Sequence, residues 1–375
     1  MKLEGLRVLD LSLFLPGPHL TTMLADHGAE VIKIEPPGEG EPTRHIGYRS
    51  GDASVWFRNT HRGKKSIVLD LKNKEDHARL LNLADTSDVM IEAFRPGVVE
   101  RLGVDYASIA KRNRGIVYAS IAGFGQTGPE RLRPAHDLGI EALAGVVSLN
   151  LGRDGQPAQP HMPVADINGS MMALAGILMA LYRREKTGEG DYIDISMHDA
   201  TVSWLPNAVG SVFAEDRAPV VQQERSWGGH SFYQIYPTKD QKHVVLSGVE
   251  AKFIRNLLTD FDRPDLIPTA LLPPGPAQET VKAFLRAKFL EKTRDEWDAW
   301  MNGRDICYAP VLDLHEALHQ PQLAQRNMVF RDAEGHLHIG NPIQFKNEPA
   351  QINTAIPTMG QHNSLVGKPE EKPAS

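Results

Sequence analysis

Residues 6–34 read LRVLDLSLFLPGPHLTTMLADHGAEVIKI and contain a complete strand–helix–strand pattern. The apolar run from Leu6 to Leu11 predicts a buried strand, Pro18 begins a helical pattern, and Glu30 to Ile34 predicts the next strand. Two strands joined through a helix pair in parallel, because a parallel connection needs a crossover of this length. This stretch therefore predicts an α/β fold built on a parallel sheet.

The same alternation continues along the chain. Helical patterns cover 75–84 and a region ending at Lys111, and strand patterns cover 89–94 and 116–121. Strands that alternate with helices predict a doubly wound, Rossmann-like sheet. Ligands of such sheets bind beyond the carboxyl ends of the strands, so we expect the loops after these strands to carry the function.

The second half of the chain changes character. A long apolar helix is expected from Ile167 to Tyr182, then a strand at 191–197 and an apolar, helical stretch at 200–213. Beyond a polar segment, the patterns predict a smaller α+β domain: antiparallel strands within 231–249, helices at 279–291 and 294–301, and a strand at 307–312.

We therefore expect three regions. Residues 1–215 form a Rossmann-like large domain with the functional groups, residues 216–330 form the small α+β domain, and residues 331–375 return to the large domain. The last region ends in a mobile tail from Ser364, because the sequence there offers little to bury.

Composition narrows the function. The chain has 375 residues and a formal net charge of -6, so no overall basic field favours nucleic acid or an anionic membrane as a partner. Cys307 is the single cysteine, which excludes an intrachain disulfide. Charges interrupt the N-terminal apolar run, and no stretch approaches the ~18 apolar residues of a membrane span. We expect a cytoplasmic protein.

One familiar motif is misleading. Gly123 to Gly128 matches the dinucleotide fingerprint G-x-G-x-x-G, but Pro129 and Pro134 follow where the fingerprint needs a helix. A dinucleotide-dependent oxidoreductase is therefore a remote alternative. The histidines lack the spacing of metal ligands, so we expect neither a metal nor a prosthetic group.

Acid and base groups interrupt two segments that otherwise look structural. His136 and Asp137 stand at the start of a helical pattern, and Asp166 is expected at the N-cap of the long apolar helix. One interpretation is structural, since aspartate is a favoured N-cap. The other is chemical, because a histidine and a carboxyl can exchange protons with a substrate. The residues alone leave both interpretations open.

Six ordered segments carry a resemblance to a known family: Gly5–Leu11, Leu24–Glu35, Arg62–Asp70, Glu92–Gly97, Ser120–Pro129 and Lys186–Gly190. With them the chain resembles the family III CoA-transferases, a group that also includes α-methylacyl-CoA racemases and carnitine-CoA transferases. The resemblance covers nearly the whole chain. It implies a large Rossmann-like domain, a small domain and an interlocked homodimer.

The resemblance also implies roles for particular residues. The family aspartate matching Asp166 is the catalytic carboxylate, which in transferases attacks the thioester. The racemase branch adds a His-Asp pair thirty residues earlier, where this chain has His136 and Asp137, whereas transferases more often have Tyr-Glu or Tyr-Asp. Glu250 matches a later glutamate of the racemases, and we expect it to orient His136. Backbone N–H groups at the start of the long helix are expected to stabilise the thioester oxygen.

Contacts to coenzyme A follow from the same resemblance. Leu69, Lys72, Phe94 and Arg101 match positions that line the CoA groove. An arginine that commonly follows the second strand is replaced here by proline, so we expect Arg44 or Arg95 to contact phosphate instead.

The leading hypothesis is an acyl-CoA enzyme that epimerises 2-methylacyl-CoA through an enolate, with His136 and Asp166 as the two bases. The alternative is a CoA-transferase in which Asp166 is a covalent nucleophile. Coenzyme A enters either reaction as part of the substrate.

Overall fold

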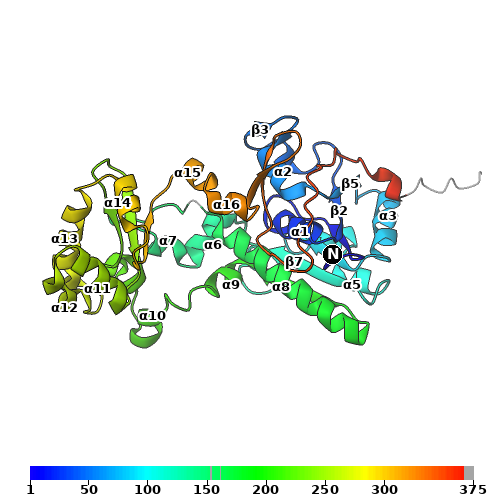
Figure 1. The fold of residues 1–375 in the computed structure, drawn as a ribbon. Coiled ribbons are helices and arrows are strands. Elements are labelled where there is room, and N and C mark those ends of the chain that lie inside the picture. Colours follow the sequence, from blue (N-terminus) through cyan, green and yellow to red (C-terminus); the bar gives the residue numbers. More distant parts are fainter. Residues whose placement is uncertain (153, 161, 367–375) are drawn as a thin grey trace, which may run out of the picture. The chain divides into compact units, whose positions relative to one another are not determined.

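The computed structural model describes residues 1–152, 154–160 and 162–366 (Figure 1). It divides into two compact units. The large unit contains 1–148, 159–204 and the chain from Pro321 onward, and the small unit contains 149–158 and 205–320. The second unit thus begins at Leu205 rather than at 216, ends at Gln320 rather than at 330, and includes a short earlier segment. Most of the expected mobile tail lies outside the described residues.

The large unit is built on a six-stranded parallel sheet with the order β5-β2-β1-β6-β7-β8. The chain moves outward from β1 on one side and then returns to place β6 on its other side, so the strand order reverses between β1 and β6. This point is where doubly wound sheets bind ligands. The strands are β1 (Arg7–Asp10), β2 (Glu30–Glu35), β5 (Lys65–Val68), β6 (Val89–Glu92), β7 (Val117–Ala122) and β8 (Asp191–Ser196).

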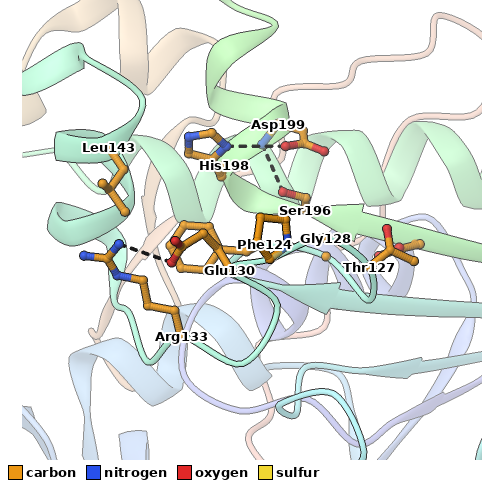
Figure 2. Close-up of a pocket in the computed structure, with 12 residues that line it drawn as sticks. Phe124, Thr127, Gly128, Glu130, Arg133, Leu143, Ser196, His198 and Asp199 are labelled. Carbon is orange, nitrogen blue, oxygen red and sulfur yellow. Dashed lines mark hydrogen bonds and ion pairs between the residues drawn. The ribbon is translucent and has the colours of Figure 1, made fainter.

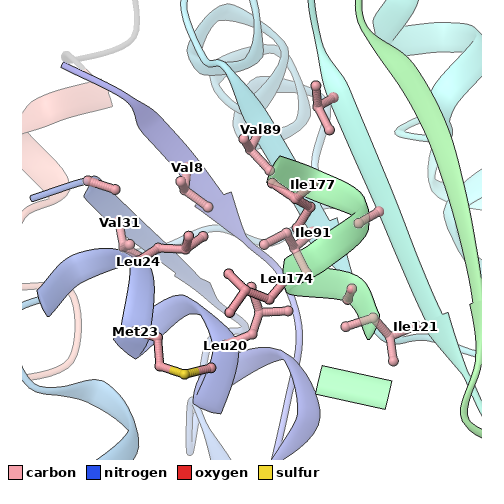
Figure 3. Close-up of a cluster of buried hydrophobic side chains, with 14 of the residues drawn as sticks. Val8, Leu20, Met23, Leu24, Val31, Val89, Ile91, Ile121, Leu174 and Ile177 are labelled. Atoms are coloured by element: carbon pink, nitrogen blue, oxygen red, sulfur yellow. The ribbon is translucent and has the colours of Figure 1, made fainter. Parts of the chain in front are cut away.

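Both faces of the sheet are covered by helices, as the alternation of strands and helices predicts. Successive side chains of a strand point to opposite faces, so Val8 and Leu9 enter different clusters. Figure 3 shows Val8 packed with Leu20 of helix α1 (Pro16–Asp26) and Ile177 of helix α8 (Val164–Thr187). Leu9 packs on the other face with side chains of α3 (Lys74–Ala84) and α5 (Tyr106–Ala110).

Helix α8 begins earlier than the sequence pattern indicated. It starts at Val164 after Pro163, so Asp166 is its third residue and not its N-cap. The sequence suggested that no segment is long and apolar enough to span a membrane. That expectation was wrong, because α8 is long and apolar enough by length and composition. A core helix has the same composition, and Ile177 is fully buried in the cluster against the sheet.

The expected helix at 200–213 is two helices, α9 (Met197–Val202) and α10 (Gly210–Glu215). Pro206 lies between them, and proline has no N–H for a helical hydrogen bond and disfavours helical backbone in the residue before it.

The small unit contains an antiparallel sheet with the order β11-β10-β9. Its core packs the sheet against helices through large side chains that include Phe289 and Trp297. Its main elements are β9 (Tyr233–Pro237), β10 (His243–Ser247), β11 (Tyr308–Pro310), α11 (Ala251–Asp260), α12 (Ile267–Ala270), α13 (Glu279–Phe289), α14 (Arg294–Met301) and α15 (Leu314–Leu318).

Shorter elements complete the described chain. They are β3 (Arg49–Ser50), β4 (Ala53–Ser54), α2 (Val55–His61), α4 (Val98–Leu102), α6 (Asp137–Leu143), α7 (Val146–Leu149), α16 (Pro321–Gln325), β12 (Val329–Arg331) and β13 (Leu337–Ile339). Of these, α6 matters most for the site, because it packs on α8 near the start of that helix.

Candidate active site

A small apolar pocket lies at the carboxyl edge of the parallel sheet. It has a volume of about 170 Å³, and its lining comes from the residues that end or follow β1, β2, β5 and β6. Three residues matched to the CoA groove line it: Leu69, Lys72 and Phe94. Its position next to the reversal of strand order is the one expected for a ligand pocket in this architecture.

Free cations stand at or next to this pocket. The side chains of Lys72, Arg95 and Arg101 are exposed, and the described residues offer them no hydrogen-bond or ion-pair partner. Arg95 and Arg101 adjoin Phe94 and Leu102, which line the pocket. An apolar pocket with uncommitted cations at its rim suits a flat ring that carries phosphate groups.

Arg44 is differently placed from these three cations. Its guanidinium pairs with the buried carboxylate of Glu35 through two hydrogen bonds of 2.8 and 2.6 Å, and it donates a third to the Pro357 carbonyl. It also lies over the Phe57 ring at 4.1 Å from the centroid. Its expected phosphate contact stays a prediction, but these bonds already use all three of its nitrogens.

The two acid-base segments meet where α6 and α8 begin. His136 is the exposed N-cap residue of α6, and its ring makes no capping hydrogen bond. Asp137 does not cap its own helix: one of its carboxylate oxygens accepts the backbone N–H of Asp166 at 3.0 Å. Asp137 therefore ties the first turn of α8 to the first turn of α6. Asp137 therefore does bond a free amide at a helix start, as the structural interpretation supposed, but the helix is α8 and not its own helix α6.

The environment of Asp166 is unusual for a carboxyl at a helix start. Such positions ordinarily favour the ionised form, because the helix dipole and free N–H groups stabilise negative charge. Here burial, and then the neighbouring charge of Asp137, raises the pKa of Asp166 from 3.8 to about 7. Both the protonated and the ionised form are therefore accessible near neutral pH, which suits a residue that both takes and gives protons.

Glu141 is a site residue that sequence inspection missed. It is fully buried on α6, and one carboxyl oxygen accepts the backbone N–H of Val164 at 3.2 Å. Burial, and then the neighbouring carboxyl of Asp137, raises the pKa of Glu141 to about 7. The signal in the sequence was the four-residue spacing from Asp137, which places both groups on one helix face.

These contacts involve two of the backbone amides that were expected to stabilise the thioester oxygen. The N–H groups of Val164 and Asp166 already bond to the carboxyls of Glu141 and Asp137. Either amide can serve a thioester oxygen only after its present bond opens.

The comparisons with known proteins agree with this geometry. A model of CoA-transferase family III matches residues 3–363. The chain belongs to CoA-transferase family III.

Relatives in this family include both kinds of reaction. The chain is 36% identical over 350 residues to the acetyl-CoA:oxalate CoA-transferase of Acetobacter aceti, covering 91% of this chain and 88% of that protein. It is 32% identical over 382 residues to the α-methylacyl-CoA racemase of Homo sapiens, covering 99% and 92%. A crystal structure of a CAIB/BAIF family protein from Brucella suis is similar with a TM-score of 0.85 at 27% identity, covering 97% and 98%.

Glu250, the remaining residue matched to the family site, lies in the small unit. It is the exposed N-cap residue of α11 and makes no capping hydrogen bond with its side chain. Its expected role in orienting His136 stays a prediction. An exposed carboxylate that does not cap its helix is available for another partner.

The glycine loop of this family member lines a second pocket, of about 440 Å³ (Figure 2). No helix begins directly after the loop, since the next one, α6, starts at Asp137. The backbone N–H of Gln126 donates to both carboxylate oxygens of Asp194, at 3.0 and 3.1 Å. A dinucleotide pyrophosphate would meet this carboxylate where the fingerprint offers free amides. Neither His136 nor Asp166 lines this pocket.

Within 1–152, 154–160 and 162–366, no three or more histidine, cysteine, aspartate or glutamate side chains are arranged to hold a metal ion.

Proposed function

We propose that this protein epimerises the α-carbon of 2-methylacyl-CoA thioesters, with His136 and Asp166 as the two groups that transfer protons. The observation that carries the proposal is the junction of α6 and α8, where Asp137 of the His-Asp pair bonds the amide of Asp166 and the pKa of Asp166 is raised to about 7. Inversion needs one group that removes a proton and another that returns one, in opposite protonation states.

The proposed reaction has two proton transfers. One group takes the α-proton, the electron pair moves toward the thioester oxygen to give an enolate, and the other group delivers a proton to the opposite face of the α-carbon. With a pKa of about 7, Asp166 is available in both forms at neutral pH, so it can act in either direction. The reaction as proposed needs only acid and base groups, and coenzyme A takes part as a portion of the substrate.

Binding of the CoA portion is assigned to the pocket at the sheet edge. Leu69 and Phe94 offer the apolar walls, and Lys72, Arg95 and Arg101 offer uncommitted charge for the phosphates. We assign Glu250 to the orientation of His136 on the resemblance alone.

A second reaction is favoured by the 36% identity to a CoA-transferase. In that reaction the Asp166 carboxylate attacks the thioester carbon, the acyl–oxygen bond forms, the carbon–sulfur bond breaks and CoA leaves as the thiolate. The CoA thiolate then attacks the Asp166 carbonyl of this anhydride, which releases the donor acid and leaves CoA on Asp166 as a thioester. The acceptor carboxylate attacks that thioester and displaces CoA, and the thiolate then attacks the acceptor carbonyl, which forms the new acyl-CoA and restores the Asp166 carboxylate. This chemistry needs Asp166 ionised, and the raised pKa leaves part of it protonated at pH 7.

Proton NMR in heavy water tests the choice between the two reactions. A single epimer of a 2-methylacyl-CoA is incubated with the wild-type protein, with Asp166→Asn and with His136→Ala. The proposal expects deuterium at the α-carbon with the wild type alone. Absence of exchange, together with transfer of CoA to an added carboxylic acid, would replace the racemase with the transferase.

We also propose that the active protein is a cytoplasmic homodimer. Apolar side chains stand exposed on α8 and α10, among them Met179, Tyr182 and Phe213. Exposed apolar surface of this kind commonly marks an interface. Light scattering of the purified protein measures the mass directly, and a monomer at assay concentrations would contradict the dimer.

A further inference from the structure

The backbone at Phe14 has a conformation that phenylalanine rarely adopts. Among the described residues, five that are not glycine have a positive φ: Phe14 at 63°, Asp216 at 50°, Gln241 at 61°, Asp262 at 56° and Asn327 at 53°. Aspartate and asparagine tolerate this left-handed region because their short side chains bond locally, whereas a bulky side chain is strained there. Phe14 alone in this group combines the strained backbone with a large apolar side chain.

Buried ions hold the loop in this conformation. The N–H of Phe14 donates to one carboxylate oxygen of Glu41 at 3.1 Å, and the other oxygen of Glu41 pairs with the Lys33 ammonium at 3.1 Å. Glu41 and Lys33 have at most 1% of their side chains exposed. Lys33 also donates to the carbonyl of Ser12 and lies 3.7 Å from Asp10. The loop is thus fixed at the Ser12 carbonyl and at the Phe14 N–H by buried charges that are too costly to leave unpaired.

The strained residue links the two parts of the candidate site. Its chain neighbour, Leu13, lines the apolar pocket assigned to CoA. Its own ring meets the His136 ring edge to face, with centroids 6.5 Å apart and planes at 87°. The Phe14 side chain is 38% exposed, so part of the ring remains open.

Strained backbone that the surrounding structure over-determines is typical of functional sites. Glycine would satisfy this backbone without strain, so the conformation itself does not explain a phenylalanine. What this backbone conformation achieves is the position of the Phe14 ring beside His136.

We propose that Phe14 is a positioning residue, which holds the His136 imidazole in place and presents the open part of its ring to the acyl chain of the substrate. The edge-to-face contact restricts the rotation of the imidazole, and the apolar ring keeps water from one side of it. This inference rests on the proposed function only in giving His136 a proton to transfer.

The test compares Phe14→Gly with Gln241→Gly. Both substitutions relieve a left-handed backbone, but Gln241 lies in the turn between β9 and β10 of the small unit and is not among the residues of the candidate site. Both variants should keep or raise the wild-type melting temperature. Only Phe14→Gly should lower kcat for α-proton exchange, by about tenfold, because a displaced catalytic group costs at least this much. The affinity for free CoA should stay unchanged, and Phe14→Tyr should restore kcat because it keeps the ring.

A second measurement is independent of turnover. The His136 signal is followed in proton–carbon NMR spectra of histidine-labelled protein, with His136→Gln to assign it. Phe14→Gly should shift and sharpen this signal, while Gln241→Gly should leave it in place. A wild-type signal and a wild-type kcat in Phe14→Gly would overturn the inference. A shifted signal in a protein that shows no α-proton exchange would support the positioning role and place the failure in the proposed reaction.

Discussion

Replacing Asp166 by asparagine should stabilise the protein at neutral and alkaline pH. The pKa of Asp166 is raised from 3.8 to about 7, so the folded state holds this proton more tightly than the unfolded chain does. The stability linked to this proton is fully present below pH 3.8 and is lost as the pH rises through 7. Asparagine has no proton to lose, so the variant does not lose stability in this way as the pH rises.

The size of the effect follows from the same values. Each factor of ten in proton affinity corresponds to about 1.36 kcal/mol, so the rise from 3.8 to about 7 costs the wild type about 4 kcal/mol once the group is ionised. At pH 5 part of this cost is already present, because the unfolded carboxyl is ionised. Between pH 5 and pH 8 the gain of Asp166→Asn over the wild type should therefore grow by roughly 3 kcal/mol.

Urea unfolding followed by circular dichroism measures this gain at both pH values. Glu296→Gln is the matched control, because Glu296 is also the third residue of its helix, α14, yet bonds from Thr293 lower its pKa. Glu296→Gln should lose stability at pH 8 where Asp166→Asn gains it. An Asp166→Asn variant whose advantage is the same at pH 5 and pH 8 would refute the raised pKa. The reasoning about catalysis would then lose its main support.

Three further outcomes are expected. His136→Ala should abolish α-proton exchange and leave any CoA transfer to an acid largely intact. Equal loss of both activities in NMR assays would contradict a role for His136 in proton transfer alone. Glu141→Gln keeps an oxygen that accepts the Val164 amide but cannot ionise, whereas the wild-type Glu141, with a pKa of about 7, gains a charge beside Asp137 and Asp166 as the pH rises. The activity of the variant should therefore persist to higher pH than that of the wild type. A pH–rate profile measures this, and an unchanged alkaline limb would show that Glu141 has no part in the site. Lys72→Ala and Arg101→Ala should each weaken CoA binding about five- to tenfold in calorimetry and reduce its salt dependence, because each removes an uncommitted cation; wild-type affinity in both would place the phosphates elsewhere.

Local rules made much of the fold predictable. Residues 6–34 form the strand, helix and strand that their pattern indicates, because each element has its own apolar period and the proline stands at the helix start. Helix α14 was placed at its observed bounds, and its start is explained by a capping box between Thr293 and Glu296. Signals of this kind act within a few residues, so a sequence displays them directly.

The geometry of the site depends on contacts between distant residues, and these were not predictable. Asp166 was expected at an N-cap, but the helix begins one turn earlier, and the bond from Asp137 crosses 29 positions of the chain. The pairing of Arg44 with the buried Glu35 carboxylate was likewise not visible in the sequence. Glu141 looked like an ordinary helix residue, because nothing local to it shows that α8 covers it.

Three features that lower the stability of the fold lie together at the candidate site. Asp166 and Glu141 are carboxyls whose pKa values are raised by burial, and Phe14 has a strained backbone. Each of them lowers stability, and a chain selected for stability alone would have little reason to keep them together. Glu141 accepts the Val164 amide at the start of α8, Asp166 lies in the same turn, and Phe14 contacts the histidine at the start of α6. Their common effect is to fix a proton donor and a proton acceptor in place before a substrate arrives, which is the property that a proton-transfer site needs.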